Sequence, residues 1–83
     1  MENLRGFEVV FLGATNSRGA RVRIIDTRFN KTKIISYDYE FNNVGDIAEK
    51  FLKGIGIECL FKCELQKGYM LLTKNFNIQI KWR

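Results

Sequence analysis

The sequence predicts an α+β fold: a single antiparallel sheet of five or six strands with one helix packed on one face. Three short β-type runs come first, one amphipathic helical stretch follows, and two or three further β-type runs end the chain. The expected order is therefore βββαββ(β). At 83 residues, without proline or a linker-like segment, residues 1–83 form one domain.

The first half of the chain predicts three strands. They span residues 7–12, 20–26 and 33–39. The first run is almost entirely apolar, which favours a central strand. In the second, Val22 and Ile24 point to one face and Arg21 and Arg23 to the other, because side chains alternate along a strand. The first two strands then form a hairpin with a long loop, in which Gly13 and Gly19 are expected to provide unusual φ angles.

The helix is the clearest element. Its apolar positions recur at helical spacing and predict one buried stripe, which includes Phe51 as a buried aromatic residue. The stripe comprises Val44, Ile47, Ala48, Phe51 and Leu52. Asn43 is the expected N-cap, with Asp46 beside the first-turn amides. Gly54 is expected to end the helix in the left-handed conformation.

The second half predicts strands over residues 57–65, 69–73 and 76–82, the last either a separate strand or a continuation bent at Asn75. Cys59 and Cys63 fall on the apolar side of the first of these and are expected to be buried core thiols. On a strand they lie about 13 Å apart, too far for a disulfide or for one tetrahedral ion. With no histidine in the chain, no metal and no cofactor are predicted.

The net charge is +5, which favours anionic partners such as nucleic acid or an acidic protein. No apolar run approaches the ~18 residues of a membrane span, so no membrane association is expected. The N-terminal residues lack the pattern of a signal peptide, and a cytoplasmic location is predicted. A chain this short buries a small core, which leaves a homodimer open.

Basic residues are concentrated in one stretch. Six of the 14 Lys and Arg residues lie between Arg18 and Lys33. Arg21 and Arg23 share a strand face about 7 Å apart, near the phosphate spacing of a nucleic-acid strand. The patch is extended by Arg18, Arg28, Lys31 and Lys33, with Phe29, Tyr37 and Tyr39 near enough in sequence to stack on bases. A solvated strand face with these aromatics in the core explains the same pattern equally well.

The loop GATNSRG, from Gly13 to Gly19, does not fit a P-loop. Five residues separate its glycines, and Ala20 and Arg21 follow in place of Lys and Ser or Thr. A hairpin loop is the simpler interpretation. Its tip nevertheless offers four polar side chains that could bind phosphate, sugar or a protein backbone. They are Thr15, Asn16, Ser17 and Arg18.

The run from Gly13 to Val22 resembles the G-P-T-N-T-K-G-S-R-I signature of short proteins carried by phages, plasmids and integrated elements. Tyr37-Asp38 and the Lys67-Gly68-Tyr69 turn are similar to later parts of the same pattern. The likeness covers roughly residues 7 to 74 and departs at Ala14, where those proteins usually have proline. It implies a mobile-element setting, without an assigned activity.

These observations predict a small, non-enzymatic nucleic-acid-binding accessory protein of a mobile genetic element. The alternative is a protein–protein effector, such as an inhibitor of a host defence nuclease or a phage assembly subunit, with a host or phage protein as partner. A metal-dependent nuclease is the weakest reading, since it would depend on Asp26, Asp38 and Glu40, and an Asp-x-Glu pair is common by chance.

Overall fold

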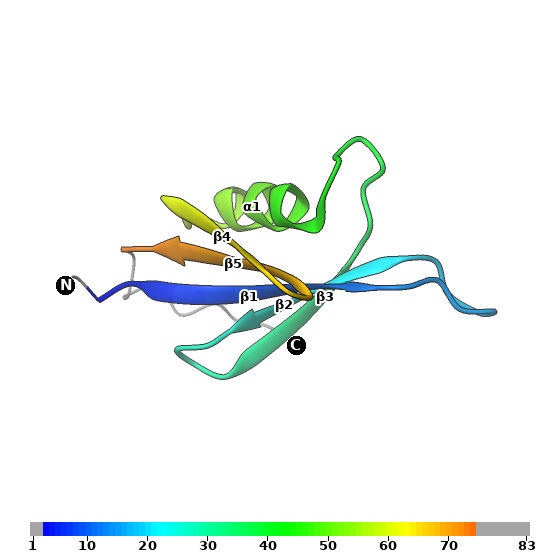
Figure 1. The fold of residues 1–83 in the computed structure, drawn as a ribbon, viewed down its shortest axis with the longest axis horizontal. Coiled ribbons are helices and arrows are strands. Elements are labelled where there is room, and N and C mark those ends of the chain that lie inside the picture. Colours follow the sequence, from blue (N-terminus) through cyan, green and yellow to red (C-terminus); the bar gives the residue numbers. More distant parts are fainter. Residues whose placement is uncertain (1–2, 75–83) are drawn as a thin grey trace.

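The computed structural model describes residues 3–74 and confirms the predicted α+β fold, with one helix on one face of an antiparallel sheet (Figure 1). The elements in chain order are β1 (Arg5–Leu12), β2 (Arg21–Asp26), β3 (Lys31–Ser36), α1 (Val44–Gly54), β4 (Phe61–Leu65) and β5 (Gly68–Thr73). The predicted strand over residues 76–82 lies outside the described residues.

The five strands are arranged in the order β3-β2-β1-β5-β4, and every neighbouring pair is antiparallel. The apolar first strand is therefore central, as predicted, and β3 and β4 are the two edges. In the register, Val9 of β1 lies opposite Ile24 of β2 and Tyr69 of β5. Cross-strand partners share a face, so this register separates the side chains under the helix from those turned away from it.

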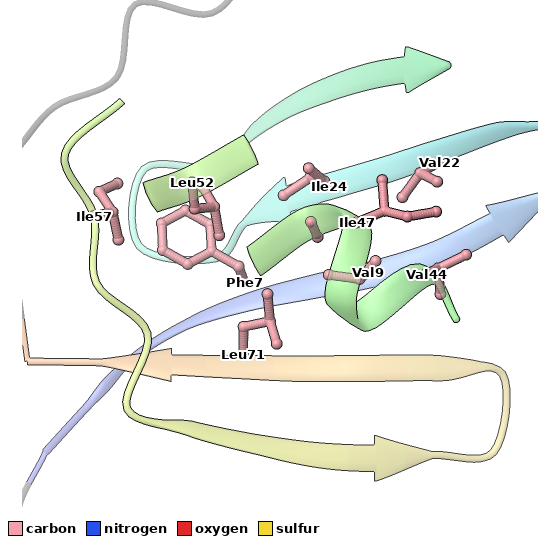
Figure 2. Packing of buried hydrophobic residues seen from close by; sticks show 10 residues of the cluster. Phe7, Val9, Val22, Ile24, Val44, Ile47, Leu52, Ile57 and Leu71 are labelled. Carbon is pink, nitrogen blue, oxygen red and sulfur yellow. The ribbon is translucent and has the colours of Figure 1, made fainter. Parts of the chain in front are cut away.

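The core lies between α1 and the sheet. Figure 2 shows side chains of β1, β2 and β5 meeting those of the helix. Its ten apolar members are Phe7, Val9, Val22, Ile24, Val44, Ile47, Ala48, Leu52, Ile57 and Leu71. Burial of this surface is the main stabilising contribution to a domain of this size. Four of the five predicted helix positions are buried, but Phe51 only packs partly against the cluster, because it lies at the margin of the stripe.

Hydrogen bonds at both ends fix the length of α1. Asn43 is the N-cap, as predicted: its side-chain oxygen accepts from the Asp46 backbone N–H at 2.9 Å. At the other end, the left-handed residue is Gly56 at φ 93°, so the prediction of Gly54 was wrong. The Ile57 N–H donates to the Leu52 carbonyl at 2.9 Å, and both side chains are fully buried. This Schellman arrangement ends the helix two residues later than the sequence indicates.

The predicted strand over residues 57–65 is shorter in the structure. Ile57 turns inward to complete the helix C-terminus, and the strand begins only at Phe61. The prediction of two buried thiols was wrong, because Cys63 is exposed and Cys59 is half-buried. Both are free thiols. Burial and the carboxylate of Glu49 raise the pKa of Cys59 to about 11.

A buried ion pair closes one end of the core, which we call the proximal end. Arg5 donates to both carboxylate oxygens of Asp26, and each residue is 1% exposed. The Arg5 guanidinium lies 4.9 Å from the ring centre of Phe7 and 5.0 Å from that of Phe29. Phe29 is therefore part of this end of the fold and is not an exposed stacking residue. Asp26 also accepts from the Arg28 backbone N–H at 3.1 Å, which holds the turn between β2 and β3.

Candidate nucleic-acid interface

The candidate interface lies at the opposite end of the sheet, which we call the distal end. The hairpin of β1 and β2 extends there well past the helix (Figure 1), and the domain measures 43 Å along its longest axis. The distal end comprises the loop from Gly13 to Ala20, the last residues of β1 and the segment that follows β3. The Tyr37 N–H donates to the Ala20 carbonyl at 3.1 Å, which brings that segment beside the loop.

Two hydrogen bonds between the same residues order the loop tip. The Thr15 N–H donates to the Arg18 carbonyl at 2.8 Å, and the Arg18 N–H donates to the Thr15 side-chain oxygen at 3.2 Å. All seven residues from Gly13 to Gly19 are exposed. Neither glycine has a positive φ, so the predicted conformational role of Gly13 and Gly19 was wrong. The turn within the loop is closed by Thr15 instead, and Asn16 and Ser17 stand at its tip.

Three aromatic side chains form a cluster beside this loop. Phe11 and Tyr37 meet edge to face with ring centres 5.6 Å apart, and Tyr37 and Tyr39 are 4.9 Å apart. Phe11 is 50% exposed and Tyr39 is 80% exposed, whereas Tyr37 is half-buried between them. Tyr37 thus supports two exposed rings. An exposed ring held by a second ring offers a flat apolar surface on which a base can stack.

Arg21 and Arg23 lie on the other face of the same hairpin. The register pairs Arg21 with Leu12 and Ser36, and Arg23 with Val10 and Ile34, all turned away from the helix. The predicted alternation of β2 is therefore confirmed. Both arginines are half-buried, and the Nε atom of each is buried without a hydrogen-bond partner among residues 3–74. Among the sequence-predicted basic residues, these two are closest in the fold to the loop that carries Arg18.

The remaining predicted basic residues are not gathered with them. Arg28 lies in the turn at the proximal end, a full strand length away. Lys31 and Lys33 pair with Asp26 and Ile24, so they share the face of the sheet on which α1 packs. The basic stretch between Arg18 and Lys33 is continuous in sequence, but the structure divides it between two ends and two faces.

The carboxylates considered for a nuclease are also apart. Asp26 is held by Arg5 in the core. Asp38 accepts from the Glu40 backbone N–H at 3.0 Å and lies 4.0 Å from the Lys50 ammonium, in a turn and not on a strand. Within residues 3–74, no group of three or more acidic or thiol side chains is placed to bind a metal ion.

Two features of this geometry escaped the sequence prediction. Phe11 was not singled out within the apolar run of residues 7–12, although it is 50% exposed in the structure. Arg5 was not considered, although it pairs with the one acid of the basic stretch. The alternation of β1 with Phe7 and Val9 inward places Phe11 on the helix side, but only the structure shows that Phe11 is half exposed and packs against Tyr37.

No family model, no curated protein and no solved structure matches the chain. In the part of the chain that the structure describes, no helix is both long enough and apolar enough to span a membrane. The case for function therefore depends on the geometry of the distal end.

Proposed function

We propose that the protein binds nucleic acid through its distal end, without catalysing a reaction on it. The observation that carries this proposal is the cluster of Phe11, Tyr37 and Tyr39 beside the polar loop that presents Arg18. Stacking on exposed rings and contacts to phosphate are the two components of most single-strand recognition, and the exposed rings and the polar loop lie at the same end of the sheet.

The arrangement favours a single strand over a duplex. A duplex hides the faces of its bases, so exposed aromatic rings gain little from it, whereas an unpaired base can stack on Tyr39 or Phe11. The hydroxyls of Thr15 and Ser17, the amide of Asn16 and the guanidinium of Arg18 are suited to phosphate and sugar. Such contacts carry little sequence information, so we expect weak sequence preference.

The charge distribution supports the same proposal. Arg18 lies in the loop, and Arg21 and Arg23 lie on the neighbouring strand face. A strand that stacks on the aromatic cluster and passes around the hairpin would meet about three positive charges, which adds a salt-dependent contribution to affinity. Together with the loop signature, this is consistent with an accessory protein of a mobile element that acts in the cytoplasm.

Binding is tested by fluorescence anisotropy with single-stranded and duplex DNA and RNA at low ionic strength. Tyr39→Ala is expected to weaken single-strand binding about 5- to 150-fold, because a stacked base contributes about 1–3 kcal/mol. The matched control is Phe61→Ala, which removes another exposed aromatic ring, 59% exposed, from the far edge of the sheet. Equal affinity of wild type and Tyr39→Ala, or no binding to any nucleic acid, would contradict the proposal.

The effector alternative has one observation in its favour. β3 and β4 are the edges of the sheet formed by residues 3–74, and Ile34 on β3 and Phe61 on β4 are 45% and 59% exposed. An unpaired edge can accept a strand from a partner protein such as a host nuclease or a phage assembly protein. Loss of partner binding on a Thr32→Pro change in β3, with nucleic-acid binding intact, would favour this alternative.

A further inference from the structure

A groove runs between the edge strand β3 and the helix α1, on the face of the sheet that the helix covers. Its volume is about 440 Å³. Its apolar lining comprises Ile35 of β3 with Ile47, Phe51 and Ile55 of the helix and its C-cap. Ile35 and Phe51 are half-buried and Ile55 is 39% exposed, so the groove is accessible from solvent. An apolar groove beside an edge strand combines a site for a side chain with unpaired backbone groups.

The hydrogen bonds of β3 show which of its backbone groups point outward. The Tyr37 N–H donates to the Ala20 carbonyl, and these two residues continue the β2–β3 register by one pair. In an antiparallel ladder, pairs that exchange hydrogen bonds alternate with pairs that do not. Lys33 and Ile35 therefore bond to β2, and the residues between and beside them have N–H and C=O groups that point away from it. These residues are Thr32, Ile34 and Ser36. Within residues 3–74, no strand pairs with β3 on that outer side.

Lysine side chains flank the groove. Lys31 and Lys33 lie on the same face of β3 as Ile35, because side chains alternate along a strand, and Lys50 lines the groove from α1. Asp38 also lines it, with its carboxylate 4.0 Å from the Lys50 ammonium. Neither Lys31 nor Lys33 forms an ion pair with another residue in the part of the chain that the structure describes. The surface beside β3 is therefore positive and favours carboxylates.

We propose that this groove binds an extended acidic segment of a partner protein, which adds to β3 as an antiparallel strand. The segment's residue opposite Ile35 has its side chain on the helix side, where it enters the groove, because cross-strand partners share a face. The residues two and four positions later lie opposite Lys33 and Lys31, where acidic side chains are favoured. The partner segment thus has a large apolar residue, followed two and four positions later by aspartate or glutamate.

The other edge of the described sheet, β4, is less suited to such a segment. The groove beside it is smaller, about 170 Å³, and Lys62 in its lining already pairs with Asp46. A segment added to β3 also leaves Arg21 and Arg23 accessible, because they lie on the opposite face of β2, one strand inside the edge. The inference therefore goes beyond the proposed nucleic-acid binding, on which it does not depend, and specifies the partner that the edge of β3 accepts.

The experiment is an NMR titration of the isotope-labelled full-length protein with short peptides capped at both ends. The test peptide is Ser-Leu-Thr-Glu-Thr-Glu-Ser. The control peptide, Ser-Leu-Glu-Thr-Glu-Thr-Ser, has the same composition but places its carboxylates on the opposite face of the added strand. We expect saturable binding of the test peptide, with slower hydrogen exchange of the outward N–H groups of Thr32, Ile34 and Ser36. The control peptide should bind at least about threefold more weakly.

A charge exchange tests the register. Lys33→Glu should weaken binding of the test peptide about 3- to 10-fold, and a peptide with lysine in place of the first glutamate should bind this variant more tightly than the test peptide does. The matched control is Lys67→Glu, which makes the same charge change in the turn between β4 and β5 and should alter the affinity less than about twofold. Single-stranded DNA should bind both variants equally, so failure of this inference is distinguishable from failure of the proposed nucleic-acid binding.

Four outcomes overturn the proposal. The first is no binding of the test peptide at concentrations up to about 1 mM. The second is equal affinity for the test and control peptides. The third is a set of spectral changes confined to β4 or to the distal end instead of β3. The fourth is displacement of the bound peptide by single-stranded DNA, which would show that the lysines bind anions of any kind. Circular dichroism of each variant verifies that the fold is retained.

Discussion

The two ends of the sheet combine arginine with aromatic rings in opposite environments. At the proximal end, Arg5 is buried between Phe7 and Phe29 and pairs with Asp26. At the distal end, Arg18 stands in an exposed loop beside Phe11 and Tyr39. The helix covers the first end and stops short of the second. The same side-chain chemistry therefore stabilises the fold at one end and remains available to a ligand at the other.

The largest effect is expected from breaking the proximal ion pair. Asp26→Asn removes the carboxylate that pairs with the buried Arg5 guanidinium and should lower the free energy of unfolding by about 3–5 kcal/mol in a urea titration. Glu40→Gln at the distal end is the matched control and should change it by less than about 0.5 kcal/mol, since Glu40 is exposed. A similar decrease in the free energy of unfolding for both variants would mean that the two ends contribute equally to stability.

Two glycines extend the comparison to the packed sheet and the exposed loop. A Cβ at Gly68 would lie 2.0 Å from the Val9 carbonyl oxygen, a backbone atom that cannot yield easily. Gly68→Ala should therefore cost about 1–3 kcal/mol, whereas Gly19→Ala meets nothing within 4 Å and should be neutral or slightly stabilising. Thermal unfolding of both variants tests this, and a stable Gly68→Ala protein would contradict the β1–β5 register.

The distal arginines should affect binding far more than stability. With Arg18, Arg21 and Arg23 contacting phosphate, log affinity for single-stranded DNA should fall with log salt with a slope of about −2. Replacing Arg21 and Arg23 with alanine should weaken binding by a similar factor for all nucleic-acid sequences. It should also remove most of the dependence of log affinity on log salt. The control is Lys31→Ala with Lys33→Ala on the helix side of β3, which should leave the slope almost unchanged. If the arginine variant unfolds, these residues belong to the fold.

The smallest effect concerns the two thiols. At pH 8, Cys63 should react first with a thiol reagent, because it is exposed, while Cys59 is half-buried and its pKa is raised to about 11. Folding raises the pKa of Cys59 from 9.0. The protonated thiol therefore makes its full contribution to the free energy of unfolding below pH 9, and this contribution is lost as the pH rises toward 11. Mass spectrometry of partly labelled protein distinguishes the sites, and equal labelling rates would contradict the assigned burial.

Several parts of the structure were predictable because they depend on local chemistry. The apolar spacing and the Asn43 cap define where α1 begins, and the alternation of β2 separates Arg21 and Arg23 from Val22 and Ile24. The spacing of apolar residues along a helix or strand indicates which side chains share a face of that element, because the backbone geometry fixes the direction of each side chain. These positions agree with the structure without reference to any distant residue.

The sequence by itself thus determined the fold class, the element order and the side of β2 on which its arginines stand. Only the tertiary structure decided that β1 extends beyond the helix and leaves Phe11 exposed, that Arg5 neutralises Asp26, and that Lys31 and Lys33 face away from Arg21 and Arg23. The physical reason is that exposure and charge pairing depend on which residues distant in sequence come together. Those long-range contacts depend on the strand order, the register and the length of the helix, none of which can be read from a local sequence pattern.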